Sequence, residues 1–368
     1  MSKIEDQTNF YNSKAKKTGW RDFIRLDFIS LSAFTMAEIL ISLTIIGVIA
    51  AITLPSLKAN INEKTWATQK KALYSRMSQA ISMMPSLNGY GEYAGTWSDN
   101  NVSVSQDTAA EKFVTNGLAM VLNINNICSI PMSMTNLTDR HKELAKCGIP
   151  DNLTTLANSK MSFPTKLSEL NPMFTSTLIQ GTSTYINPQN NIDTNVAAFE
   201  TSNGESVAAF YNPFCQADAN VEEEHYVQPY MCANFIYDLN GKKGPNKVGK
   251  DIGFISALYP VETEVVAPMP LTKNAGTSSM KQMLAAAACR EQDINSRLPN
   301  ADELSSMFYN RQLVGILSGS YWSSVIDLKY NIKLSNTADH KAIRQAFGSG
   351  KRASFRRESK SNVRCIKR

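Results

Sequence analysis

An apolar run near the N-terminus constrains the fold more than any other feature of this sequence. The polar side chains between Ile39 and Leu54 are Ser42, Thr44 and Thr53. Together with residues 34–38 the run reaches about 20 residues, the length that a helix needs to cross a membrane. Glu38 lies near its start, although a carboxylate at the bilayer centre costs about 2.5–3.5 kcal/mol. The run predicts a membrane-spanning helix over 34–54 that contains one costly charge.

Basic residues before the run set its expected orientation. They include Lys14, Lys16, Lys17, Arg21 and Arg25. Positive charge stays on the cytoplasmic side, so residues 1–33 should remain inside and the C-terminus should be exported. A secretory signal ends in small residues after its apolar core, whereas Ala33 comes before the core. Cleavage at Ala33 would therefore leave the hydrophobic helix on the mature protein.

The residues around the start of the run resemble the type IV prepilin signal. That signal has a small residue, usually Gly, then Phe-Thr-Leu-x-Glu, an apolar run and a proline; this chain has AFTMAE at 33–38 and Pro55. The resemblance implies cleavage after Ala33 and N-methylation of Phe34 by a prepilin peptidase/methyltransferase. It also implies that Glu38 pairs with a neighbouring subunit's N-terminal amine, which makes both charges tolerable. A plain signal anchor with a chance glutamate is the alternative.

The helix should continue beyond the apolar run with an amphipathic pattern. The apolar positions are Leu57, Ile61, Leu73, Met77, Ile81 and Met84, with charged residues between them. We expect one helix over 34–84, ended by Pro85 and able to bend at Gly47 or Pro55. Its second half should pack on a globular domain.

Residues 86–260 are typical of short strands and loops. Residues 198–212 predict a hairpin with Asn203-Gly204 at its turn, and 230–241 a strand that enters another Asn-Gly turn. Ser/Thr/Asn-rich residues 98–108 and 172–195 should be loops. The expected fold class is α+β, a helix on an antiparallel sheet, which is also the architecture of pilins.

Six cysteines, no C-x-x-C pair and only three histidines favour disulfides in an oxidising compartment over a zinc site. Sequence order favours the pairs Cys128–Cys147, Cys215–Cys232 and Cys289–Cys365, although other connectivities remain open.

Residues 238–251, DLNGKKGPNKVGKD, combine oxygen ligands with glycines and a proline. Asp238, Asn240, Asn246 and Asp251 could bind calcium, which prefers carboxylate, amide and carbonyl oxygens on a sharply turning backbone. The spacing is not that of an EF-hand, and four lysines dilute the negative charge. The alternative is an Asx-turn loop held by its own side chains. Calcium is the one cofactor that the sequence suggests.

The composition changes after residue 260. Residues 261–279 are rich in Pro, Thr and Ala and predict a linker, and 300–303 (Asn-Ala-Asp-Glu) predict a helix start. Motifs in 280–368 then resemble the Fibrobacter-type paralogous domain, also called the DUF1566 or Lcl C-terminal-like domain. These motifs are Arg297-Leu298-Pro299, Glu303-Leu304, Tyr321-Trp322-Ser323-Ser324 and Val363-Arg364-Cys365. The resemblance implies a small C-type-lectin-like domain closed by Cys289–Cys365, with Trp322 in its core.

The net charge of +6 is concentrated near the C-terminus, where Glu358 is the one acidic residue of 341–368. Lys351, Arg352, Arg356 and Arg357 surround Phe355 and could bind polyanions such as DNA or acidic glycans. A solvated pair of strands is the alternative.

No phosphate-binding loop, H-E-x-x-H motif or nucleophile elbow is present in the sequence, so we do not expect an enzyme. The hypothesis is a pilin, minor pilin or pseudopilin of a type IV pilus or type II secretion-like filament, with a C-terminal module for adhesion. Its partners would be other pilin subunits, the processing enzyme and the pilus assembly platform. The precursor would be a single-pass inner-membrane protein, and the mature form would lie in an extracellular pilus or periplasmic pseudopilus. The alternative is a membrane-anchored surface receptor for a ligand or DNA that does not polymerise.

Overall fold

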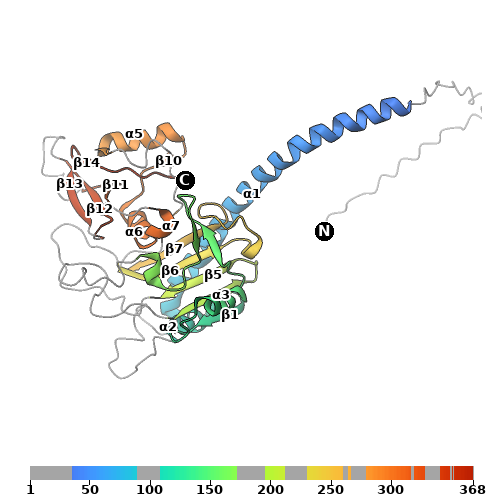
Figure 1. Ribbon diagram of the computed structural model, residues 1–368. Helices are drawn as coiled ribbons and strands as arrows, with labels where there is room; N and C mark the ends of the chain where they lie inside the picture. The colour runs from blue at the N-terminus through green and yellow to red at the C-terminus, as the bar shows by residue number, and fades with distance from the viewer. Residues whose placement is uncertain are drawn as a thin grey trace, which may run out of the picture. The chain divides into compact units, whose positions relative to one another are not determined.

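The computed structural model describes residues 35–88, 108–171, 195–211, 230–259, 264–266, 279–315, 319–327, 340–348, 350 and 352–367. The chain divides into two compact units, residues 1–60 and 61–368. Figure 1 labels the main elements. The described part is α+β, as expected from the sequence.

Helix α1 (Met36–Asn88) begins in the first unit, where its residues 36–53 form a segment long and apolar enough to cross a membrane. The helix is unbroken at Gly47 and Pro55. It ends at Asn88 and not at 84, because the fixed φ of Pro85 is compatible with a helix even though proline removes one hydrogen-bond donor.

The second unit is built on a six-stranded antiparallel sheet in the order β1-β4-β5-β6-β7-β8. The strands are β1 (Ile124–Ile130), β4 (Val196–Thr201), β5 (Ser206–Tyr211), β6 (Tyr230–Asp238), β7 (Ile252–Tyr259) and β8 (Glu264–Val266). The predicted Asn203-Gly204 hairpin is confirmed: it joins β4 to β5, with Gly204 at φ +82° and its amide donating to Thr201 O. Glycine suits this left-handed position because it has no Cβ.

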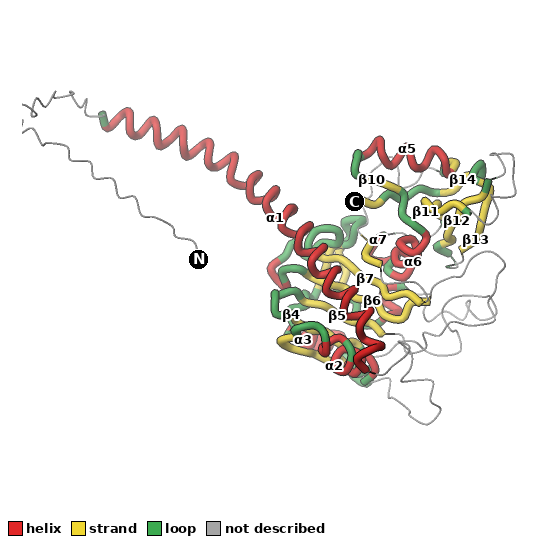
Figure 2. Tube along the Cα trace, turned by 180° about the vertical axis from the view of Figure 1, so that it is seen from behind, coloured by secondary structure: helices red, strands yellow, loops and turns green. Residues whose placement is uncertain are grey.

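One face of the sheet packs against the second half of α1 and against α2 (Ala109–Asn116), with the 3₁₀ turn Leu118–Met120 beside them. Leu73, Met77, Ala80 and Ile81 of α1 are each no more than 1% exposed. The strand residues on this face include Ala197, Phe199, Val207, Ala209, Ala233, Phe235, Ile255 and Ala257. Figure 2 shows this part of α1 across β5, β6 and β7. The expectation that the amphipathic half packs on a sheet is confirmed.

The opposite face of the sheet is also covered. Its residues include Ala198, Ala208, Phe210, Ile236, Phe254 and Leu258. Over them lie α3 (Leu137–Ala145), the hairpin β2 (Asn152–Thr154) and β3 (Lys160–Ser162), α4 (Leu167–Leu170), and two helices from the C-terminal part of the chain. Because both faces are buried, every residue of β5 is buried, and its sequence SVAAFY shows no polar alternation.

The C-terminal part contains short helices and small sheets. Its elements are β9 (Met280–Lys281), α5 (Gln282–Gln292), β10 (Ser296–Arg297), α6 (Ala301–Tyr309), α7 (Arg311–Val314), β11 (Ser320–Ile326), β12 (Lys341–Ala346), β13 (Arg352–Arg356), β14 (Lys360–Ser361) and β15 (Ile366–Lys367). Strand β11 pairs with β12 and β12 with β13, while β10 pairs with β15 and β9 with β14. The predicted start of α6 is confirmed as a capping box between Asn300 and Glu303.

The C-terminal part shares a core with the large sheet. Leu304 and Met307 of α6 belong to the same buried cluster as Phe254 of β7, and Figure 1 shows α6 and α7 beside this strand. Strand β8 lies within the range 261–279 that we expected to be a linker, and it pairs with β7; the remainder of that range up to 278 lies outside the described residues. The C-terminal part is thus packed onto the sheet.

Candidate functional sites

Glu38, the expected assembly residue, lies in the first turn of α1 and is hydrogen-bonded to Thr35. Its Oε2 accepts from the Thr35 amide at 2.9 Å and from Thr35 Oγ1 at 3.0 Å. In return, the Glu38 amide donates to Thr35 Oγ1 at 3.2 Å. This reciprocal pair is a capping box, which satisfies amide donors that the start of a helix leaves free. The expected cleavage and methylation residues, Ala33 and Phe34, lie outside the described residues.

The capping box gives Glu38 a local role that we did not assign from the sequence, although the Thr-x-x-Glu spacing at 35–38 signals it. Capping does not use all the hydrogen-bond acceptor positions of the Glu38 carboxylate. Both hydrogen bonds from Thr35 reach Oε2, and a carboxylate offers two oxygens with about four lone-pair directions. The glutamate can therefore cap the helix and also accept a further donor or cation.

The surface that follows Glu38 is apolar and exposed. Met36 is 79% exposed, Leu40 and Ile46 are each 62%, and Ile52 is 72%. Isolated apolar side chains on a surface are ordinary, but a contiguous apolar surface indicates contact with lipid or another protein. Residues 36–53 therefore present a contiguous apolar surface along their length.

Polar contacts as well as apolar ones fix the second half of α1. Arg76 Nη2 lies 2.5 Å from Glu205 Oε1, and the Glu205 side chain is only 4% exposed. Thr201 Oγ1 also donates to this carboxylate. Lys70 Nζ donates to Gly249 O at 2.8 Å, in the loop between β6 and β7. These contacts join α1 to the two turns of the sheet whose sequences contain Asn-Gly.

The expected calcium ligands Asp238, Asn240, Asn246 and Asp251 all lie in or beside the β6–β7 loop, which includes the 3₁₀ turn Gly241–Lys243. Asp238 Oδ1 accepts from the Asn240 amide at 3.0 Å, and Asn240 Nδ2 donates to Gly244 O at 2.9 Å. The two oxygens of Asp251 accept from the amides of Asn246 and Lys247, each at 2.8 Å. The loop thus forms the side-chain to backbone hydrogen bonds that an Asx turn has.

Three side-chain oxygens of the same loop are buried without a hydrogen-bond partner among the described residues. They are Asp238 Oδ2, Asn240 Oδ1 and Asn246 Oδ1. Burial raises the pKa of Asp238 to about 7, with the charge of Asp251 adding to the effect. Burial also lowers the pKa of Lys70 to about 8, against the opposing effect of Asp251. The loop therefore contains more buried hydrogen-bond acceptors than its own hydrogen-bond donors satisfy.

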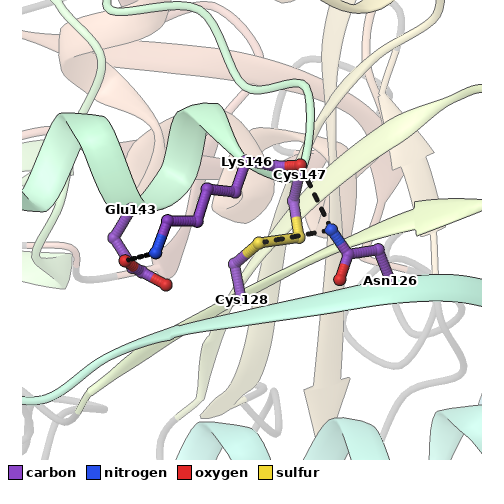
Figure 3. The surroundings of a disulfide bond; sticks show 5 residues. All are labelled: Asn126, Cys128, Glu143, Lys146 and Cys147. Atoms are coloured by element: carbon purple, nitrogen blue, oxygen red, sulfur yellow. Dashed lines mark hydrogen bonds and ion pairs between the residues drawn. A yellow bond between two sulfur atoms is a disulfide. The ribbon is translucent and has the colours of Figure 1, made fainter.

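The expected disulfides Cys128–Cys147 and Cys289–Cys365 are both formed. Figure 3 shows that Asn126 Nδ2 donates to Lys146 O at 3.2 Å beside the first bond, while Lys146 Nζ pairs with Glu143 Oε2 at 2.6 Å. Cys232 is also disulfide-bonded, and its expected partner, Cys215, lies outside the described residues. The first bond links the residues just after α3 to β1, and the second links α5 to the segment between β14 and β15.

The predicted basic surface near the C-terminus needs correction at Arg352. This residue is 2% exposed. Its guanidinium bonds Asp302 Oδ1 at 2.7 Å, Ala301 O at 2.5 Å and Ser305 Oγ at 2.9 Å. These bonds attach β13 to α6. Because Arg352 is buried with these partners, a polyanion cannot reach it.

The other predicted polyanion residues are not gathered into one site by the described structure. Arg356 is exposed, Arg357 Nε donates to Gln282 Oε1 at 2.8 Å, and Lys351 lies outside the described residues. Trp322 is fully buried and its indole donates to Met280 O at 2.9 Å, which confirms it as a core residue.

No protein-family model and no curated protein matches the chain.

Proposed function

We propose that this chain is a structural subunit, a pilin, minor pilin or pseudopilin, of a type IV pilus or type II secretion-like filament. The precursor is held in the inner membrane by α1, is cleaved after Ala33 and methylated on Phe34, and then assembles through the same helix. Its partners are other copies or other pilins, the processing peptidase/methyltransferase and the assembly platform. The mature protein belongs to an extracellular pilus or a periplasmic pseudopilus.

The observation that best supports the proposal is the contrast within α1. Residues 36–53 expose their apolar side chains and begin with a carboxylate, while Leu73, Met77 and Ile81 are buried against an antiparallel sheet. A membrane anchor needs only an exposed apolar segment. A filament subunit needs both, because one half of the helix binds neighbours and the other half carries the displayed domain.

The C-terminal part is proposed as the displayed surface, in keeping with its resemblance to the Fibrobacter-type paralogous domain. Its attachment to the sheet includes a buried polar cluster: Asn234 and Asn310 exchange hydrogen bonds at 2.8 and 2.9 Å, and the hydroxyls of Ser256 and Ser306 lie 2.7 Å apart. A displayed surface attached in this way has a fixed orientation on the subunit.

A second candidate is a membrane-anchored surface receptor that does not polymerise. The capping box favours it, because Thr35 gives the Glu38 carboxylate a hydrogen-bonded role within its own helix. In this alternative the N-terminal segment is a signal anchor, and Phe34 is never a terminus.

Mass spectrometry of the mature N-terminus separates the two candidates. The full chain is expressed in a host that has a prepilin peptidase, and in the same host without the peptidase as a control. The proposal predicts a mature chain that begins at Phe34 with one methyl group on its amine, only when the peptidase is present. An intact Met1, or cleavage elsewhere in both strains, would contradict the proposal.

A further inference from the structure

The β6–β7 loop has more buried acceptor oxygens than donors to satisfy them. Asp238 and Asp251 are both fully buried. The three oxygens without a partner in the described chain, on Asp238, Asn240 and Asn246, come from one stretch of nine residues at 238–246. Buried polar groups in native proteins are nearly always paired, so three orphaned oxygens in one loop indicate a missing partner.

Contacts within the loop link the residues that carry these oxygens into a closed ring, which consists of Asp238, Asn240, Gly244, Asn246, Asp251 and Leu239. Asp238 is linked to Asn240, and Asn240 to Gly244, through the hydrogen bonds at 3.0 and 2.9 Å. A Cβ on Gly244 would lie 3.9 Å from Asn246 Oδ1, and the Asn246 amide donates to Asp251. The ring closes because the Leu239 amide donates to Asp251 O at 3.0 Å.

In two of these side chains, a hydrogen bond within the loop uses one polar atom and leaves the other without a partner. The Asp238 carboxylate already faces the loop, since its Oδ1 accepts from the Asn240 amide. The Asn240 side chain uses its NH₂ group to donate to Gly244 O, which leaves Oδ1 as the atom that lacks a partner. The backbone supports this arrangement with left-handed residues at Gly241, Gly244 and Asn246.

The chemistry of the missing partner follows from these atoms. All three orphaned oxygens are acceptors, and a water molecule can donate only two hydrogens. Residues 238–251 contain no His or Cys, so a soft metal is disfavoured. Two carboxylates and two amide oxygens on a turning backbone match the hard-oxygen preference of calcium.

The lysines around the loop do not supply the missing charge at Asp238. Lys242, Lys243 and Lys250 are exposed, and Lys247 Nζ donates to Asn158 Oδ1 at 2.5 Å. Lys70 donates to Gly249 O and interacts with Asp251.

We infer that the β6–β7 loop is a calcium site, with Asp238, Asn240, Asn246 and Asp251 as its side-chain ligands. Two carboxylates place it with weak, extracellular calcium modules, whose Kd lies at about 10⁻⁴–10⁻³ M. Since Lys70 of α1 and Thr154 of β2 both bond this loop, bound calcium would brace the helix and the hairpin against the sheet. The inference does not depend on filament assembly.

The test is thermal unfolding of the purified full chain in detergent, with calcium chloride, magnesium chloride or EDTA at equal ionic strength. Calcium at about 100 times Kd should raise the Tm by about 3–6 °C. Magnesium should raise it less, because magnesium keeps its waters and demands octahedral geometry.

Two variants and a matched control decide the site. Asn246→Gly removes an orphaned oxygen while tolerating φ +49°, and Asn158→Gly makes the same change at another left-handed asparagine, φ +65°, outside the ring. Asp238→Asn removes the charge. The calcium-induced rise should disappear in Asn246→Gly and Asp238→Asn and persist in Asn158→Gly. An equal Tm in calcium and EDTA for the unmodified chain, or a calcium response that survives both ring variants, would overturn the inference.

Discussion

Residues 36–53 and 64–83 belong to one helix, and both segments contain large apolar side chains at short intervals. In the first segment Leu40 and Ile52 are 62% and 72% exposed; in the second Leu73 and Met77 are 1% and 0% exposed. The segments differ in how apolar residues are distributed around the helix. The first is apolar on all sides, whereas the second has exposed charged residues, Lys64 and Lys71, between its buried positions.

This difference shows that the distribution of apolar residues predicts the partner of each segment better than their number does. A one-sided pattern matches a single sheet face within the same chain. A helix that is apolar on all sides needs an apolar environment on all sides, as lipid or a bundle of other helices provides. The first half of α1 is thus suited to intermolecular packing, and the second half to intramolecular packing.

The comparison predicts a large difference between two identical substitutions. Leu73→Ala should lower the free energy of unfolding of the second unit by about 2–5 kcal/mol, because it opens a cavity between α1 and the sheet. Leu43→Ala, at a residue that is 60% exposed, should change it by less than about 0.5 kcal/mol. Denaturant unfolding of both full-length variants in detergent measures this. An equal loss of unfolding free energy in the two variants would contradict the difference between the two halves of α1.

A smaller effect should come from the polar anchor of the second half. Arg76→Met leaves the buried Glu205 carboxylate without its ion pair, so we expect a loss of about 1–3 kcal/mol in the free energy of unfolding. Lys71→Met, at an exposed position on the same helix, is the matched control and should have little effect. The double variant Arg76→Met with Glu205→Gln should recover part of the loss. Additive losses would show that the pair does not couple.

Local signals in the sequence predicted much of the fold. The Asn203-Gly204 turn, the start of α6 at Asn300 and the amphipathic half of α1 each depend on residues within a few positions of one another. The disulfide Cys128–Cys147 likewise joins two cysteines that are 19 residues apart. Such features are predictable because their physical causes are short-range.

The packing of the C-terminal part on the sheet was not predictable in the same way. Asn234 and Ser256 lie within strands and resemble solvent-facing positions, yet both are fully buried because Asn310 and Ser306 reach them from about 50 to 76 residues away. Arg352 was misassigned for the same reason: its partners Asp302 and Ala301 precede it by about 50 residues. Long-range pairing of polar groups leaves no local pattern.

The candidate calcium site was partly predictable. The residue types of 238–251 suggested it, but only the structure shows that Asp238 and Asn240 retain buried oxygens without partners in the described chain after the loop has formed its own hydrogen bonds. The Thr-x-x-Glu spacing at 35–38 is a local signal of the capping role of Glu38.

The most direct test of the central proposal separates the charge of Glu38 from its cap. Glu38→Gln keeps an oxygen for Thr35 but removes the charge, and Thr35→Ala removes the hydroxyl cap but keeps the charge. Each variant is expressed as the full-length precursor, and the measurement is the amount of its mature form in sheared filaments relative to the amount of the protein in membranes. We predict that Glu38→Gln falls by about tenfold or more, equivalent to at least 1.4 kcal/mol, while Thr35→Ala stays within about twofold of the unmodified chain. Equal recovery of Glu38→Gln and the unmodified chain, or a loss confined to Thr35→Ala, would contradict assembly through this glutamate.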